Sequence, residues 1–280
     1  MHDKVVVITG ATSGIGQVAA ERLAEMGARI VQIARDRGRG EAALTRLRAR
    51  APGVAHRVHH GDLSRMAEIR RVAAEIASAE PRIDVLINNA GALFSARRVT
   101  PEGLEMTFAL NHMAYFLLTH ELRERLLAGA PARVINTTSD AHRRGRLDFD
   151  DLQSARDYRG LAVYGLSKLC NILYTRELAR RWAGTGVTVN SLHPGFVATR
   201  FGDESGGFLS YGIRLAKLFG LSSEKGAETL VYLASSPEVA TISGGYFYKC
   251  QLARPTREAQ DDAAARRLWA ETERLASVGG

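Results

Sequence analysis

Cysteine is scarce in this sequence, and its two examples, Cys170 and Cys250, stand alone. Neither belongs to a Cys-x-x-Cys pair or has a histidine at metal-ligand spacing, which excludes a recognisable zinc motif and a disulfide framework. Both lie among apolar residues, so we expect buried, reduced thiols of a cytoplasmic protein. The histidines at 112, 142 and 193 also lack ligand spacing and a carboxylate partner. The sequence therefore predicts no metal site.

Long apolar runs are absent as well. No uninterrupted stretch reaches the roughly 20 residues of a membrane-spanning helix, and no signal-peptide pattern precedes the first apolar run at residues 4–8. We therefore expect no membrane span. The net charge is +8, but the arginines are scattered through predicted helices without interleaved aromatics, which argues against a nucleic-acid partner. A solvated, arginine-rich surface is the better interpretation, and the charge would also help to attract a phosphorylated cofactor.

Short β-branched runs alternate with longer amphipathic segments along the chain. Strands are predicted at residues 5–9, 29–34, 56–61, 85–88, 133–137 and 187–192, with helices such as 16–26 and 66–79 between them. This alternation is typical of an α/β fold, in which helices cover both faces of a doubly wound, Rossmann-type parallel sheet. No repeat, low-complexity tract or linker divides the chain, so residues 1–280 are predicted to form one domain.

Two further segments have their own composition. Residues 201–221 are rich in glycine and aromatic residues, and they form either a lid over the substrate or a plain surface excursion. Residues 257–278 read as a polar C-terminal helix with one apolar stripe, formed by Leu268, Trp269, Thr272 and Leu275. Such a stripe predicts packing against the rest of the protein.

A glycine-rich turn joins the first predicted strand to the first helix, and we expect it to bind a dinucleotide pyrophosphate. Gly10 permits a sharp turn, Gly14 a close approach of the backbone to the ligand, and Gly16 close packing of helix on strand. The helix N-terminus attracts the anionic group. The predicted contacts of this turn are Gly10, Thr12, Ser13, Gly14, Ile15 and Gly16.

The end of the second strand distinguishes the two nicotinamide dinucleotides. An acidic residue there would accept hydrogen bonds from the ribose hydroxyls, but Ala34 takes that place and Arg35 follows it. Arginine suits a 2′-phosphate, so the sequence favours NADP(H) over NAD(H), with Arg39 as a helper. Asp36 leaves alternatives open, because it could pair with Arg35 or reach the ribose itself.

Other predicted cofactor contacts follow the later strands. Asp62 and Leu63 suit the adenine ring, although Asp62 could equally be the N-cap of the next helix. After the fourth strand, amides tie adjacent strands while small residues leave room for the cofactor, and after the sixth strand free backbone groups suit the carboxamide. These predicted contacts are Asn89, Ala90, Gly91, Pro194, Gly195, Val197 and Thr199.

Tyr164 and Lys168 stand four positions apart, on one face of a predicted helix. Reduction of a carbonyl by hydride needs a proton donor within hydrogen-bond reach of the oxygen. A free tyrosine titrates near pH 10, so work near neutrality requires roughly 4 kcal/mol of differential stabilisation of the phenolate. We expect Lys168, helped by the oxidised nicotinamide, to supply it.

Two more polar residues complete the predicted centre. Ser139 ends the fifth strand, at the edge where doubly wound folds bind ligands, and its hydroxyl would hold the substrate oxygen. Asn111 stands inside a helical pattern, where a polar amide is unfavourable. It is either a water holder at a helix kink, connecting solvent to Lys168, or a satisfied buried amide.

In their order along the chain, these residues resemble the short-chain dehydrogenase/reductase family from end to end. The resemblance implies a catalytic tetrad of Asn111, Ser139, Tyr164 and Lys168, with Lys168 also binding the nicotinamide ribose. Within the family the chain is most similar to the branch of retinol dehydrogenases and WW-domain oxidoreductases, on the stretches 111–119, 147–152, 167–173, 193–195 and 245–250. Paired helices in this fold imply a homodimer or homotetramer.

The sequence thus predicts an oxidoreductase that transfers hydride between NADP(H) and a ketone or aldehyde, or the corresponding alcohol. The substrate would be a fairly apolar small molecule in a pocket walled by Phe94, Phe201, Phe208 and Tyr211. The alternative is a nucleotide-sensing protein of the same fold without significant turnover. The intact tetrad argues against it, because a sensor needs no proton donor.

Overall fold

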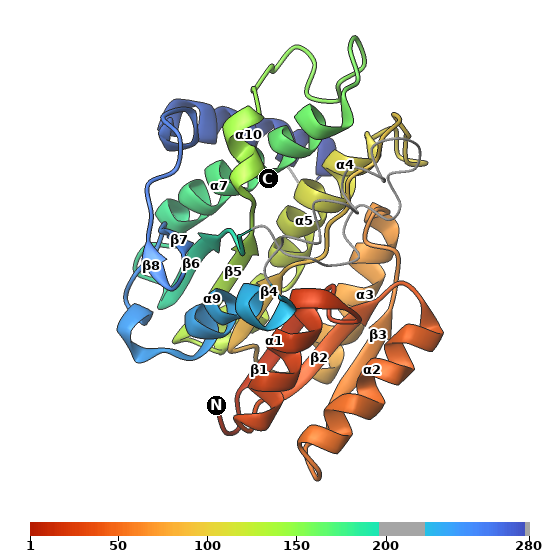
Figure 1. Ribbon diagram of the computed structural model, residues 1–280, viewed down its shortest axis with the longest axis vertical. Coiled ribbons are helices and arrows are strands. Elements are labelled where there is room, and N and C mark those ends of the chain that lie inside the picture. Colours follow the sequence, from red (N-terminus) through yellow and green to blue (C-terminus); the bar gives the residue numbers. More distant parts are fainter. Residues whose placement is uncertain (196–221, 278–280) are drawn as a thin grey trace.

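The computed structural model describes residues 1–195 and 222–277. Their strands form one eight-stranded sheet in the order β3-β2-β1-β4-β5-β6-β7-β8 (Figure 1). All neighbouring strands pair in parallel except β7 and β8, which pair antiparallel. Their bounds are β1 Val5–Thr9, β2 Arg29–Ala34, β3 Arg57–His60, β4 Val85–Asn88, β5 Ala132–Thr137, β6 Val187–Leu192, β7 Tyr246–Tyr248 and β8 Gln251–Leu252.

Helices cover both faces of the sheet, as predicted. In Figure 1 the helices α1 (Gly14–Glu25) and α9 (Ser223–Ser235) lie in front of it. The helices of the opposite face are α3 (Met66–Ala79), α5 (Ala114–Glu121), α7 (Gly160–Arg181) and α10 (Asp262–Ala276). The other helical segments are α2 Arg37–Arg50, α4 Met106–Phe108, the π-helical η1 Ala109–Met113, α6 Arg123–Ala128, and the 3₁₀ helices η2 Asp140–Arg144, η3 Pro237–Val239 and η4 Glu258–Gln260.

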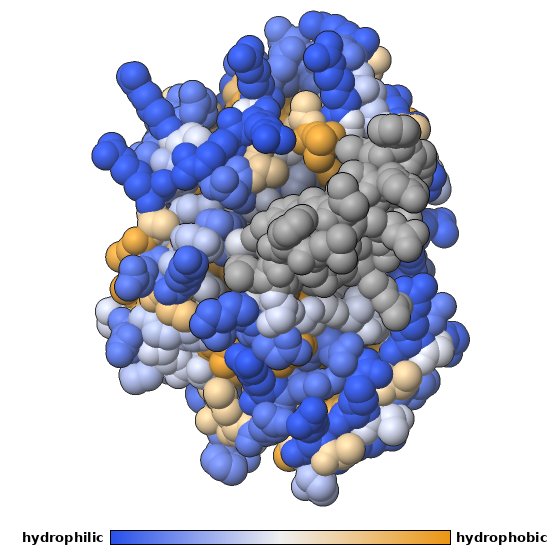
Figure 2. All heavy atoms as spheres, in the orientation of Figure 1, coloured by the Kyte–Doolittle hydropathy of each residue, from blue (hydrophilic) through white to orange (hydrophobic). Residues whose placement is uncertain are grey.

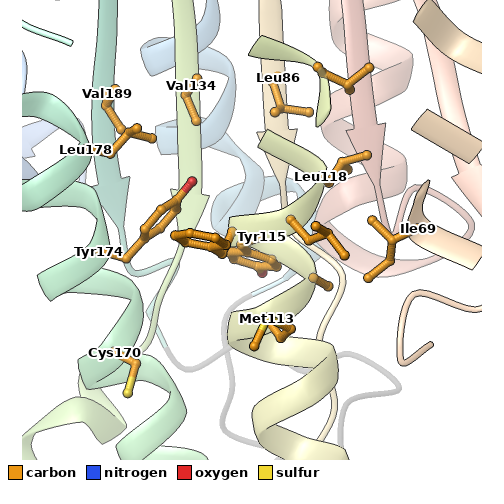
Figure 3. Close-up of a cluster of buried hydrophobic side chains, with 14 of the residues drawn as sticks. Ile69, Leu86, Met113, Tyr115, Leu118, Val134, Cys170, Tyr174, Leu178 and Val189 are labelled. Atoms are coloured by element: carbon orange, nitrogen blue, oxygen red, sulfur yellow. The ribbon is translucent and has the colours of Figure 1, made fainter. Parts of the chain in front are cut away.

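The core divides into two clusters because successive residues of a strand point to opposite faces of the sheet. In β1, Val5 and Val7 belong to the cluster that contains α3, α5, α7 and α10, whereas Val6 and Ile8 pack with α1 and α9. Figure 3 shows the first cluster, in which Tyr115 of α5 and Tyr174 of α7 lie beneath the strands. Every residue of β1 is buried, as expected for a strand covered on both faces.

The antiparallel hairpin β7–β8 was not predicted, because strands of three and two residues are too short to show a period. Its two-residue loop, Lys249 and Cys250, has φ angles of +49° and +61°. Positive φ at both positions is the requirement of a type I′ turn. The loop position leaves Cys250 only half-buried, so its predicted burial is wrong, whereas that of Cys170 is confirmed.

The C-terminal helix begins later than predicted. Residues 258–260 form the separate 3₁₀ helix η4, and the Asp261 carboxylate then accepts hydrogen bonds from the N–H groups of Ala263 and Ala264, at 2.8 and 3.0 Å. This capping fixes the start of α10 at Asp262. The predicted stripe faces inward: Leu268, Trp269 and Thr272 are buried, and Leu275 packs against the same cluster.

The described helices include none that is both long and apolar enough to cross a membrane. Hydrophilic side chains cover most of the face in Figure 2, and the hydrophobic groups among them are small and scattered.

Candidate active site

A cavity of about 1130 Å³ runs along the carboxyl ends of the parallel strands. This is where doubly wound sheets bind ligands, beside the point at which the strand order reverses, here between β1 and β4. Its volume exceeds the approximate range of 300–1,000 Å³ typical of one drug-sized ligand. Among the described residues predicted for the site, all line the cavity except Asn111 and Phe94. The cavity therefore has room for a dinucleotide together with a second small molecule.

The glycine turn has the geometry that a pyrophosphate requires. Gly10 has a φ angle of +68°, and a Cβ added to Gly16 would lie 2.3 Å from the Gly10 carbonyl oxygen, so α1 packs directly on the turn. The side chain of Ser13, the N-cap of α1, makes no capping hydrogen bond, and the first turn carries no acidic residue. The N–H groups of that turn are thus available to an anionic ligand.

Arg35 lies on the cavity wall at the end of β2, as predicted, and Arg39 lies near it on the same wall. The Asp36 carboxylate accepts a hydrogen bond from the Arg39 N–H at 2.8 Å and is the N-cap of α2. The sequence predicted pairing with Arg35 or a contact with the ribose for Asp36, and not this capping role. The Asp36 carboxylate is therefore used within α2, and Arg35 and Arg39 are the basic residues on this part of the cavity wall.

The Asp62 carboxylate closes a tight turn. One oxygen accepts hydrogen bonds from the Ser64 N–H and hydroxyl, at 3.0 and 2.8 Å. Helix α3 starts only at Met66, with Arg65 as its N-cap, so the N-cap alternative for Asp62 is wrong. Asp62 and Leu63 lie on the cavity wall beyond β3, where the adenine contact was predicted.

Asn89 joins three strands at the floor of the cavity. Its Nδ2 donates to the carbonyl oxygens of Thr9 and Gly10, at 3.1 and 3.3 Å, and its Oδ1 accepts from the Thr137 hydroxyl at 3.3 Å. The Thr9 hydroxyl in turn accepts from the N–H groups of Asn89 and Ala90. The predicted tying of adjacent strands is present, and it fixes the glycine turn relative to β5.

Tyr164 and Lys168 lie one turn apart on α7 and are both almost fully buried. Lys168 Nζ donates to the Thr137 carbonyl oxygen at 3.1 Å and stands 5.6 Å from the centre of the Tyr164 ring. Burial lowers the pKa of Lys168 to about 7. Burial also raises the pKa of Tyr164 well above its usual value, although a hydrogen bond with the Ser139 side chain opposes the change.

The expected lowering of the Tyr164 pKa is therefore not found in the protein alone. Desolvation penalises both charged forms, and for these two residues it outweighs their mutual attraction. Tyr164 is held as the neutral phenol, which is the form that donates a proton.

Ser139 lies two residues after β5 and is the N-cap of η2, where its Oγ accepts a hydrogen bond from the Ala141 N–H at 3.2 Å. Two glycines let η2 pack closely on α7. A Cβ on Gly165 would lie 2.7 Å from the Ala141 carbonyl oxygen, and one on Gly145 would lie 2.5 Å from that of Gly165. This close contact brings the Ser139 hydroxyl to Tyr164.

Asn111 lies in the π-helical turn η1 and is fully buried. Its side chain exchanges two 2.9 Å hydrogen bonds with the backbone of Ala92 and donates to the Ser167 hydroxyl at 3.0 Å. The Asn111 side chain is thus a satisfied buried amide, one of the two predicted alternatives. The helix is also irregular here, as the other alternative expected, because Asn111 lies in a π-helical turn. Asn111 acts from behind Gly91, since a Cβ on Gly91 would lie 3.0 Å from Asn111 Oδ1 and 3.4 Å from Lys168 Nζ.

The remaining predicted site residues have different outcomes. Pro194 and Gly195 line the cavity after β6, whereas Val197, Thr199, the 201–221 segment and the three aromatic residues predicted there as pocket walls fall outside the described residues. Phe94 is buried in the protein and does not line the cavity, so its predicted role as a pocket wall is wrong. The described residues hold no group of three or more histidine, cysteine or acidic side chains that could bind a metal ion.

Residues that the sequence did not single out form the other end of the cavity. They are Arg143, Arg144, His193, Tyr246, Tyr248 and Arg254. Arg143, Arg144 and His193 follow the carboxyl ends of β5 and β6, and that position is the one signal that could have indicated them. It was not usable for β7 because that strand was not predicted.

Comparison with known proteins agrees with this arrangement. Residues 4–207 match the family model of short chain dehydrogenases. Human retinol dehydrogenase 13 is 42% identical over 98% of this chain and 85% of its own length, and human retinol dehydrogenase 14 is 42% identical over 96% and 85%. An uncharacterized protein from Mycobacterium paratuberculosis, of known crystal structure, superposes with a TM-score of 0.80 at 31% identity, over 99% of this chain and 94% of that one.

The fold and the site define a nicotinamide-dependent oxidoreductase, and the chain belongs to the short-chain dehydrogenase family. Within that family its similarities place it in the retinol dehydrogenase branch, as the sequence predicted. A more distant structure, the Pseudomonas aeruginosa RhlG/NADP complex, has a TM-score of 0.69 at 28% identity, over 88% of this chain and 94% of that one.

Proposed function

We propose that this protein interconverts a ketone or aldehyde and its alcohol with NADP(H), using Tyr164 as the general acid and base. The observation that carries the proposal is the place of Tyr164 at the cavity wall, hydrogen-bonded with Ser139 and backed by buried Lys168. Leu93, Leu110 and Leu161 line the same cavity and suit a substrate with an apolar body.

The bound nicotinamide would supply or accept the hydride. Ser139 would hold the substrate oxygen by its hydroxyl, and Tyr164 would donate a proton to that oxygen as negative charge develops there. Lys168 would hydrogen-bond the nicotinamide ribose, and its ammonium form would stabilise the resulting phenolate. Asn111, behind Gly91, positions Lys168 and connects it with the π-helical turn.

The cofactor preference rests on the end of β2. Arg35 lies on the cavity wall, Ala34 offers the ribose no carboxylate, and Asp36 is engaged as the N-cap of α2. A guanidinium can bind a 2′-phosphate through two parallel hydrogen bonds. This arrangement favours NADP(H).

Turnover tests the role of Tyr164. The purified protein with NADPH should reduce members of a panel of aldehydes and ketones that includes retinaldehyde, followed by the loss of nicotinamide absorbance. Tyr164→Phe should lower kcat by at least about 100-fold, in line with the loss of general acid catalysis, while its affinity for NADPH stays within a few-fold. Tyr232→Phe, on α9 outside the cavity, is the matched control. Full turnover by Tyr164→Phe would refute the assignment, and tight NADPH binding with no turnover across the panel would favour the sensor alternative.

Cofactor affinity tests Arg35. Arg35→Asp should weaken NADPH far more than NADH, because it replaces a phosphate partner by a carboxylate that repels the phosphate. Arg48→Asp makes the same change of charge on an exposed position of α2 outside the cavity and should affect neither cofactor strongly. Equal losses for both cofactors in Arg35→Asp would remove Arg35 from the phosphate site.

A further inference from the structure

The cavity extends past Ser139 and Tyr164, beyond Pro194 and Gly195, to β7 and β8. This far end has no role in the proposed binding of the dinucleotide. The sheet order places β2 and β7 on opposite sides of the β1–β4 switch point. The glycine turn and Arg35, which suit the pyrophosphate and the adenosine ribose, lie at the β1–β2 side. The β7–β8 end is therefore left to the substrate.

Aromatic rings and one unpaired hydroxyl form the wall at this end. The His193 ring stacks on those of Tyr248 and Tyr246, with centroids 4.1 and 5.8 Å apart. Tyr246 is 4% exposed, yet its hydroxyl has no hydrogen-bond partner in residues 1–195 and 222–277. The nearby Thr138 donates its own hydroxyl hydrogen to the Leu192 carbonyl oxygen at 2.9 Å. A buried hydroxyl at a cavity wall is left unsatisfied at a cost unless a ligand accepts from it.

His142 holds two arginine-bearing segments together at the same place. Its Nδ1–H must donate to the Ser139 carbonyl oxygen, 2.8 Å away, because that oxygen can only accept. Nε2 then carries the lone pair that accepts from the Thr256 N–H at 3.3 Å. The neutral ring thereby joins η2, which carries Arg144, to the segment after β8, which carries Arg254.

The charges at this end do not cancel. Arg143 pairs with Asp140 at 2.6 Å, which neutralises both. Arg144 and Arg254 are exposed, line the cavity, and form no salt bridge with any acidic residue in the described part of the chain. Two arginines that pair with no acidic residue in the described ranges thus line the same end of the cavity as Tyr246.

We propose that Arg144 and Arg254 bind an acidic group of the substrate, so that the protein acts on carbonyl compounds with an apolar body and a carboxylate at the far end. The carbonyl oxygen lies at Ser139 and Tyr164, and the carboxylate lies beside the two guanidinium groups, which match it in charge and in planar geometry. This inference rests on the proposed function. It adds the chemical class of the substrate.

Matched substrates isolate the charge. The pair 4-formylbenzoate and 4-formylbenzamide have nearly the same shape and differ in charge, and 4′-formylbiphenyl-4-carboxylate with its amide gives the same comparison at greater length. For at least one pair, the wild-type protein with NADPH should show a kcat/KM at least about tenfold higher for the acid, and the ratio should fall at high salt because the arginines are exposed. In the double variant Arg144→Gln, Arg254→Gln the ratio should approach one, through a higher KM for the acid and an unchanged kcat for the amide. Arg146→Gln, an exposed neighbour outside the cavity lining, should keep the wild-type ratio.

Binding without turnover separates the two proposals. Calorimetry on the dead-end complex of protein, NADP⁺ and each carbonyl compound measures affinity when no hydride is available. Tighter binding of an acid than of its amide, lost in the double variant, supports this inference even if no substrate turns over, and in that case the proposed function fails alone. Equal affinities and equal kcat/KM values within both pairs, or a ratio that the double variant leaves unchanged, would overturn the inference while turnover of the amides still supports the proposed function.

Discussion

Replacing Lys168 by methionine should stabilise the cofactor-free protein while abolishing its activity. Burial lowers the pKa of Lys168 from 10.5 to about 7. Since each pKa unit corresponds to about 1.4 kcal/mol, the folded protein bears a cost of roughly 5 kcal/mol at pH 7 and below, where the unfolded chain keeps the lysine fully charged. Methionine removes this cost and fills a similar volume. It also gives up the 3.1 Å hydrogen bond to the Thr137 carbonyl oxygen, a loss of about 1 kcal/mol, so we expect a net gain of roughly 2–4 kcal/mol.

The dependence on pH distinguishes this mechanism from ordinary repacking. For a base whose pKa is lowered by folding, the cost is complete below the folded pKa and disappears as the pH rises toward the unfolded value. The advantage of Lys168→Met in the free energy of unfolding should therefore shrink by about 2 kcal/mol between pH 7 and pH 9.

Urea denaturation of both proteins at several pH values measures this advantage. Lys225→Met, on the exposed surface of α9, makes the same substitution as a control and should give a difference that hardly varies with pH. A Lys168→Met protein that is less stable than the wild type at every pH, or whose advantage is constant with pH, would show that the burial cost has been misjudged.

Two other substitutions test the framework of the site. Gly16→Ala would place a Cβ 2.3 Å from a backbone oxygen of the glycine turn and should cost about 1–3 kcal/mol and weaken cofactor binding, whereas Gly38→Ala on α2, with nothing closer than 3.5 Å, should be neutral or stabilising in the same thermal unfolding assay. His142→Phe keeps a ring but removes the hydrogen bonds to Ser139 and Thr256, and should cost about 1–3 kcal/mol. Because burial holds the pKa of His142 below its usual value, as it does for His56, His112 and His193, the wild type should also lose stability as the pH falls below 6.5, and the phenylalanine variant should lose less.

The fold was predictable because each strand of a parallel sheet is buried on both faces and leaves an apolar run in the sequence. Four of the six predicted strands, 5–9, 29–34, 85–88 and 187–192, have the observed bounds, and the other two differ by one residue at one end or both. Strand β7 escaped notice because it is short and its partner in the hairpin is exposed. Its position beside β6 comes from tertiary pairing, which no local pattern records.

The spacing of Tyr164 and Lys168 was readable in the sequence, but the direction of the Tyr164 pKa change was not. That direction depends on how much water reaches the phenol, and burial is a property of the packed protein. Asp36 and Asp62 show the same limit: Asp62 was assigned to the cofactor and Asp36 was left between Arg35 and the ribose, and the structure shows both carboxylates bound to nearby backbone N–H groups. Acidic side chains in turns find local donors before they reach a ligand.

The energetics of Lys168 connect these features with function. A protein that gained nothing from a buried ammonium would be more stable with an apolar residue at this position. The burial that makes Lys168 costly also brings its pKa to about 7, so that near neutral pH a modest change in the surrounding charge alters its protonation. A bound dinucleotide brings such a change, because its ribose hydroxyls and the charge of its nicotinamide would lie beside the ammonium and the phenol. Lys168, which destabilises the empty protein, is thus a residue whose protonation a bound cofactor would influence.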